Sequence, residues 1–119
     1  MDTNIKILMA DDSAFMRKVL KDILTEIGFS NFIEASNGKE AIDKFNSENP
    51  NLALLDVVMP EVDGVAVVKE IGKKTKVIMV SAVGQESVIK EAKEHGALGY
   101  IVKPFEKEKV AEEIKKVLS

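Results

Sequence analysis

The sequence predicts an α/β fold of the doubly wound type, a (βα)5 three-layer sandwich built on a parallel five-stranded sheet. Two observations predict it. Five short apolar runs alternate with five stretches of helical periodicity along the whole chain, which is typical of parallel sheets because right-handed crossovers place helices on both faces. Runs such as "VIMV" at 77–80 lack polar alternation, which indicates strands that are covered on both sides.

The expected strands are short and dominated by apolar residues. The second run is short and contains a charged residue, so we expect it at an edge of the sheet. The five ranges are Ile5–Ala10, Phe32–Ala35, Leu52–Leu55, Val77–Val80 and Leu98–Val102.

The expected helices carry apolar residues at three- and four-residue spacing, and several have recognisable ends. Gly28 ends the first as a C-terminal cap does. Asn37 with Glu40 three residues later resembles a capping box that opens the second. The third is expected to begin near 63–64, the fourth to end at Gly96, and the fifth to run from about Phe105 to the C-terminus.

Composition limits the function classes. A chain of 119 residues fits one domain, residues 1–119, and it has no cysteine for disulfide or thiolate chemistry. It has neither an apolar run of the ~20 residues that a membrane span needs nor a secretory leader, so we expect a cytoplasmic protein. The net charge of −3 argues against nucleic-acid binding, and no DNA-binding domain is expected after the fifth helix.

Reactive side chains follow four of the five expected strands. Asp11 and Asp12 follow the first, Asp56 the third, Ser81 the fourth and Lys103 the fifth. Because ligands of doubly wound proteins bind at the carboxyl ends of the strands, we expect these side chains to share one edge of the sheet. The set is much more specific than any one of its members.

The chemistry of this set points to phosphoryl transfer. Three close carboxylates repel one another and call for a cation, and oxygen ligands with room for water suit Mg²⁺. Lys103 and Ser81 can hold an anionic oxygen. Phosphoryl transfer depends on such positioning and charge neutralisation, and Asp56 is the best candidate for a carboxylate nucleophile.

The motifs "DD" at 11–12, "LLDVVMPEVDG" at 54–64, "VSA" at 80–82 and "KPF" at 103–105 resemble the receiver domain of two-component response regulators. The resemblance covers the whole chain and is closest to single-domain, chemotaxis-type (CheY-like) receivers. It implies the flavodoxin-like strand order 2-1-3-4-5.

The resemblance also implies roles for the residues of the site. Asp56 would accept a phosphoryl group from the phosphohistidine of a histidine kinase. Asp12 and Asp56 would bind Mg²⁺ directly, Asp11 would bind it through water, and Val58 would contribute its backbone carbonyl. Lys103 would contact the acidic pair and then the phosphoryl group.

The same resemblance implies a switch. Ser81 would move to hydrogen-bond the phosphoryl group, and Tyr100 would then turn inward. The alternative for Tyr100 is core packing with a wet hydroxyl. A target, such as a motor or adaptor protein, would bind the surface of the fourth helix, fifth strand and fifth helix. We expect a monomer, a cis Lys103–Pro104 bond and no enzymatic activity beyond the domain's own phosphorylation and dephosphorylation.

Two apolar residues flank the expected path of the water that would hydrolyse the phosphoryl group. Neither Val58 nor Val83 can position this water by hydrogen bonding. We therefore expect slow hydrolysis unless a phosphatase assists.

Two other functions remain as alternatives. The domain could be a phosphoryl carrier in a multistep phosphorelay, which would use the same residues. It could also bind a nucleotide or flavin, but "ADDS" after the first strand lacks the glycines of a phosphate-binding loop, so this function ranks low.

Overall fold

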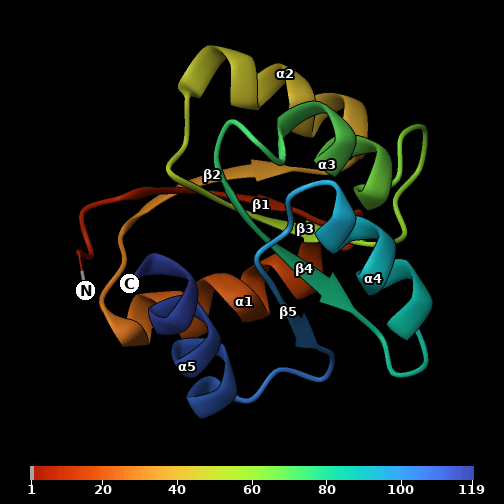
Figure 1. Cartoon of the computed structure of the whole chain (residues 1–119). Helices are drawn as coiled ribbons and strands as arrows, with labels where there is room; N and C mark the ends of the chain where they lie inside the picture. The colour runs from red at the N-terminus through yellow and green to blue at the C-terminus, as the bar shows by residue number, and fades with distance from the viewer. Residues whose placement is uncertain (1) are drawn as a thin grey trace.

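Five parallel strands form one sheet in the computed structural model, which describes residues 2–119 (Figure 1). The order β2-β1-β3-β4-β5 confirms the predicted doubly wound arrangement and its strand order. Residue 1 of the expected domain lies outside the described residues. The strands are β1 (Lys6–Ala10), β2 (Asn31–Ala35), β3 (Leu52–Asp56), β4 (Lys76–Ser81) and β5 (Gly99–Val102).

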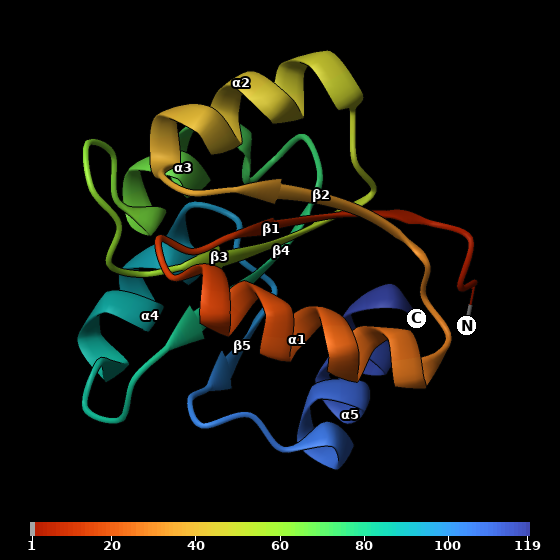
Figure 2. The ribbon, with the colours of Figure 1, turned by 180° about the vertical axis from the view of Figure 1, so that it is seen from behind.

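Helices cover both faces of the sheet and make the three layers. Two of them, α1 and α5, lie on one face, and α2, α3 and α4 lie on the other, as Figures 1 and 2 show from opposite sides. None of the helices within residues 2–119 has the length and apolar character needed to cross a bilayer. The helices are α1 (Ala14–Ile27), α2 (Gly38–Glu48), α3 (Gly64–Ile71), α4 (Glu86–Glu94) and α5 (Lys107–Leu118).

Alternate residues of each central strand serve two separate cores. In β1, Ile7 and Met9 pack with α1 and α5, whereas Leu8 and Ala10 pack with the helices of the opposite face. All five residues of β3 are buried. Burying one large aliphatic side chain contributes about 1.5–3 kcal/mol, so the apolar runs without polar alternation are explained by helices on both sides.

Three helices begin with a polar cap that their sequences supply. The side chains of Ser13, Asn37 and Asp63 accept backbone N–H groups at the first turns of α1, α2 and α3. The predicted capping box of α2 is present in altered form, because the Glu40 carboxylate accepts the N–H of Ser36 at 3.2 Å. Gly28, with φ of 128°, caps α1 as predicted.

In the second half of the chain two helices differ from their predicted bounds, β4 is one residue longer at each end (Lys76–Ser81), and β5 begins one residue later, at Gly99. α5 begins at Lys107, two residues later than predicted, because Phe105 packs against the core from the preceding turn and Glu106 is extended. α4 ends at Glu94, just before Gly96, whose φ of 117° takes the chain out of the helix. β5 lies at a sheet edge, and its residues alternate between buried and exposed.

Candidate functional site

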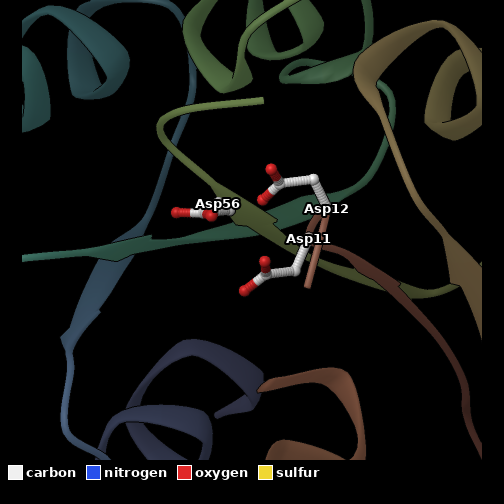
Figure 3. A group of neighbouring side chains, drawn as sticks. All are labelled: Asp11, Asp12 and Asp56. Carbon is white, nitrogen blue, oxygen red and sulfur yellow. The ribbon is translucent and has the colours of Figure 1, made fainter. Parts of the chain in front are cut away.

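Three aspartates meet at the carboxyl ends of β1 and β3. Asp11 and Asp12 directly follow β1, and Asp56 is the last residue of β3. Carboxylate oxygens of all three lie within 4.8 Å of one another. Figure 3 shows Asp12 directed toward the layer of α2 and α3, and Asp11 toward that of α1 and α5. The structure therefore brings together the acidic residues that the sequence predicted.

The register of the sheet explains this meeting. Ala10 of β1 pairs with Leu55 of β3, so the next residue of each strand, Asp11 and Asp56, lies side by side. The Ser13 N–H donates to Asp11 Oδ1 at 2.9 Å where α1 begins. Asp11 and Asp56 are buried and Asp12 is exposed, so the site opens to solvent on the side of Asp12.

Lys103 supplies the cation that opposes the buried pair. Its Nζ lies 3.0 Å from Asp11 Oδ2 and 3.3 Å from Asp56 Oδ2. The residue follows β5, and its N–H donates to the Ser81 carbonyl at 2.8 Å, which ties the turn to β4. The Lys103–Pro104 bond is cis, as predicted. One ammonium thus contacts two of the three carboxylates.

Charge and burial act in opposite directions in this cluster. Burial raises the pKa of Asp56, and the Asp11 charge raises it further, which outweighs the opposing effect of Lys103. Burial lowers the pKa of Lys103, but its hydrogen bond to Asp11 and the charges of both aspartates raise it overall. Lys103 alone therefore does not offset the burial of Asp56 and its repulsion by Asp11.

A divalent cation would supply the positive charge that Lys103 alone does not provide to the three carboxylates. The donor set consists of hard carboxylate oxygens that lie close together, with one exposed member to keep contact with water, and such a set suits Mg²⁺. Val58, whose carbonyl is the remaining predicted ligand, lies two residues after Asp56 in the loop that leads to α3.

Ser81 and Tyr100 lie on the last two strands, and Ser81 follows Val80, which pairs in register with Asp56. Ser81 is 2% exposed at the end of β4 and pairs in register with Val102 of β5. Tyr100 is 44% exposed, so its ring is not part of the core. Both residues line a hollow of about 380 Å³ between α4, the loop before it and β5, so the structure brings the two predicted switch residues to one space.

The two valines predicted to flank the hydrolytic water are both exposed. Val58 lies in the loop after β3, and Val83 lies in the loop after β4. Each is near a strand end that carries a site residue.

Two residues that position the site went unrecognised in the sequence. Arg17 donates to the Asp11 carbonyl at 2.6 Å and pairs with Glu34 at 3.0 Å, which fixes the turn between β1 and α1. Gln85 accepts the Ala82 N–H at 2.7 Å and closes the loop after β4. The available signal for Arg17 was that it is the chain's only arginine; a loop glutamine gives no such signal.

The structure defines a doubly wound α/β protein with a carboxylate cluster and a lysine at the carboxyl edge of its sheet, and comparison with known proteins gives the family. The chain belongs to the response regulator receiver domain family, which matches residues 7–115. The predicted resemblance is therefore confirmed.

Individual relatives share most of their length with this chain. It is 44% identical over 117 residues to the chemotaxis protein CheY of Bacillus subtilis, covering 96% of this chain and 98% of that one. It is 36% identical over 118 residues to the sporulation initiation phosphotransferase F of the same organism, covering 97% and 94%. The CheX–CheY–BeF3–Mg²⁺ complex from Borrelia burgdorferi matches with a TM-score of 0.89 at 35% identity, covering 97% and 90%.

Proposed function

We propose that residues 1–119 form one receiver domain in which Asp56 accepts a phosphoryl group from the phosphohistidine of a histidine kinase. The observation that carries this proposal is the position of Asp56, which is buried among Asp11, Asp12 and Lys103 at the carboxyl edge of the sheet. As a two-component response regulator, the protein would then signal by binding a partner in a phosphorylation-dependent manner.

The chemistry requires one bond to form and one to break. A carboxylate oxygen of Asp56 attacks phosphorus, the P–N bond to the donor imidazole breaks, and its electron pair returns to nitrogen. Lys103 contacts Oδ2 of Asp56, which leaves Oδ1 for the attack. Lys103 then also stabilises the negative charge of the phosphoryl oxygens.

The residues that would hold Mg²⁺ are Asp11, Asp12, Asp56 and the carbonyl of Val58. When bound, the ion neutralises the charge that develops on the transferred group. The raised pKa of Asp56 supports this assignment, since burial and then the Asp11 charge raise it by more than Lys103 lowers it.

The readout is proposed to pass through Ser81 and Tyr100 to the α4–β5–α5 surface. Ser81 would hydrogen-bond the phosphoryl group, and the Tyr100 ring would move into the hollow that the two residues share. Tyr100 and Val102 are exposed on β5, so a change at Tyr100 alters the surface that a target protein meets.

Chemotaxis is the process that the relatives favour. Identity to a chemotaxis protein CheY is 44%, against 36% to a sporulation phosphotransferase, so the carrier function is not favoured. A nucleotide or flavin function has no support from the family. Several further properties stay predictions. These are a cytoplasmic location, a monomeric state, no binding to nucleic acid, no other enzymatic activity, and dephosphorylation with help from a phosphatase.

The test is transfer of label from a ³²P-phosphorylated histidine kinase, with and without Mg²⁺. We expect label that is lost in Asp56→Asn and retained in Asp43→Asn, a control at an exposed aspartate of α2.

Affinity capture with wild type treated with acetyl phosphate should recover motor or adaptor proteins that Asp56→Asn does not recover. Label on Asp56→Asn, or identical partners for both proteins, would contradict the proposal. Transfer of label onward to a histidine of a second protein would instead favour the carrier function.

A further inference from the structure

Glu113 lies on the side of α5 that faces the sheet. Val110, Ile114 and Val117 of this helix are all buried in one core cluster. Glu113 follows Val110 by three residues and precedes Val117 by four, so it belongs to the same helical face. Glu113 itself is half-buried, so a hydrogen-bond partner offsets the partial desolvation of its carboxylate.

The partner is the backbone of the proposed switch residue. The Tyr100 N–H donates to Glu113 Oε2 at 2.9 Å. Because β5 is the edge strand and β4 pairs with its other side, this N–H would otherwise point outward without a strand to accept it. The Glu113 carboxylate of α5 therefore takes the place of a neighbouring strand at this one position.

Gly99 provides the space that this contact needs. A Cβ at position 99 would overlap Glu113 Oε2 and would lie 3.0 Å from its Cδ. Gly99 does not adopt a positive φ, so the backbone conformation there suits an alanine. The obstacle to an alanine is the Glu113 carboxylate, which its Cβ would have to displace. Gly99 and Glu113 are thus a sterically matched pair on β5 and α5.

The ring of Tyr100 is held from a different element. The Nζ atom of Lys93 in α4 lies 5.3 Å from the centroid of the ring. Lys93 also lines the hollow that Tyr100 and Ser81 share. The backbone of Tyr100 is therefore fixed by α5, while its side chain contacts α4. Only the second contact lies on the proposed path of the ring.

We propose that Glu113 is a positioning residue that fixes the Tyr100 backbone to α5, so that phosphorylation moves the tyrosine ring without moving the strand. Without this bond, β5 can shift away from α5, and the ring position no longer follows the state of Asp56. The inference rests on the proposed switch role of Tyr100 for its functional part, but the anchoring contact exists in the unphosphorylated protein and is tested separately.

The first experiment measures amide hydrogen exchange of Tyr100 by ¹⁵N NMR without phosphorylation. Glu113→Ala should speed exchange at Tyr100 by about five- to tenfold, as expected for the loss of one solvent-accessible hydrogen bond. Glu113→Gln keeps an acceptor oxygen and should retain most of the protection. Unchanged exchange in Glu113→Ala would overturn the anchoring role.

The second experiment uses the fact that Tyr100 is the only tyrosine and that the chain has no tryptophan. Acrylamide quenching of intrinsic fluorescence therefore reports on this one ring. In wild type and Glu113→Gln, Mg²⁺ with beryllium fluoride should reduce quenching. In Glu113→Ala the difference between the two states should fall by at least about half, while ³²P labelling of Asp56 stays unchanged. An undiminished difference in Glu113→Ala would overturn the positioning role.

A third variant approaches the contact from the other side. Gly99→Ala should displace the Glu113 carboxylate and speed Tyr100 exchange as Glu113→Ala does. In the Glu113→Ala background the same glycine substitution should have little further effect, whereas full additivity of the two would contradict a matched pair. If wild type accepts label at Asp56 but shows no change in quenching, the switch role of Tyr100 fails, and the exchange data still decide whether Glu113 anchors β5.

Discussion

The acidic cluster and the Ser81–Tyr100 hollow are linked through β4, where Val80 pairs with Asp56 and Ser81 lines the hollow, but they are built in different ways. Asp11, Asp56 and Lys103 are mostly buried and linked by short charged contacts. Tyr100 is half-exposed beside open space of about 380 Å³. The comparison indicates that the region proposed to accept the phosphoryl group is fixed in advance, whereas the region proposed to report it has room to move.

The largest expected effect is on the fixed region. Lys103→Met leaves Asp11 and Asp56 without the ammonium that contacts both, and we expect a loss of about 2 kcal/mol in the free energy of unfolding. Urea denaturation in EDTA measures it, and adding Mg²⁺ should recover part of the loss. Lys107→Met is the control, because its exposed pair with Glu26 at 3.7 Å is worth little. Equal effects of the two substitutions would show that the cluster is not a special electrostatic environment.

The next effect concerns the movable region and should leave stability almost unchanged. Tyr100→Ala removes an exposed ring, so we expect a change within about 1 kcal/mol in unfolding free energy and normal labelling of Asp56. Affinity for a captured target should no longer depend on phosphorylation. Tyr100→Phe keeps the ring and should keep most of the dependence. A Tyr100→Ala protein that still distinguishes the two states would place the readout elsewhere.

A smaller effect is expected at the border of the two regions. Val58→Asn introduces an amide that can orient the attacking water, so phosphoryl loss from Asp56 should accelerate roughly fivefold. The decay of ³²P label after removal of the donor measures this rate. Leu98→Asn, at an exposed position in the turn before β5, should leave it unchanged. An unaltered decay in Val58→Asn would mean that the apolar side chain does not limit hydrolysis.

The smallest effect is the dependence of stability on pH. Burial and the Asp11 charge raise the pKa of Asp56 in the folded state. An acidic group whose pKa is higher in the folded state has no effect on stability at pH values below its unfolded-state pKa. At pH values above its folded-state pKa it is ionised in both states, and it then destabilises the fold by the full amount. Wild type should therefore lose stability relative to Asp56→Asn as pH rises through this window. Asp56→Asn should melt a few degrees higher at neutral pH and should lose this advantage in acid. A constant difference across the range would contradict the raised pKa.

The sequence sufficed for the features that depend on burial and on chain direction. Runs such as 77–80 predicted strands covered on both faces, and Asp56, Ser81 and Lys103 were predicted together because parallel strands end at one edge. The start of α5 was wrong by two residues, since Phe105 continues the apolar periodicity although it lies before the helix. The Glu113–Tyr100 contact could not be predicted, because it joins two elements whose spacing depends on packing.

The position of Lys103 has a consequence for synthesis of the protein. The carboxylates lie in the first half of the chain, but their ammonium follows the last strand, and α5 must still pack beside α1 to complete one of the two cores. A nascent chain that ends before Lys103 would expose acidic residues without the group that opposes them. The proposed phosphoacceptor site should therefore be complete only after Lys103 has been synthesised and α5 has packed beside α1.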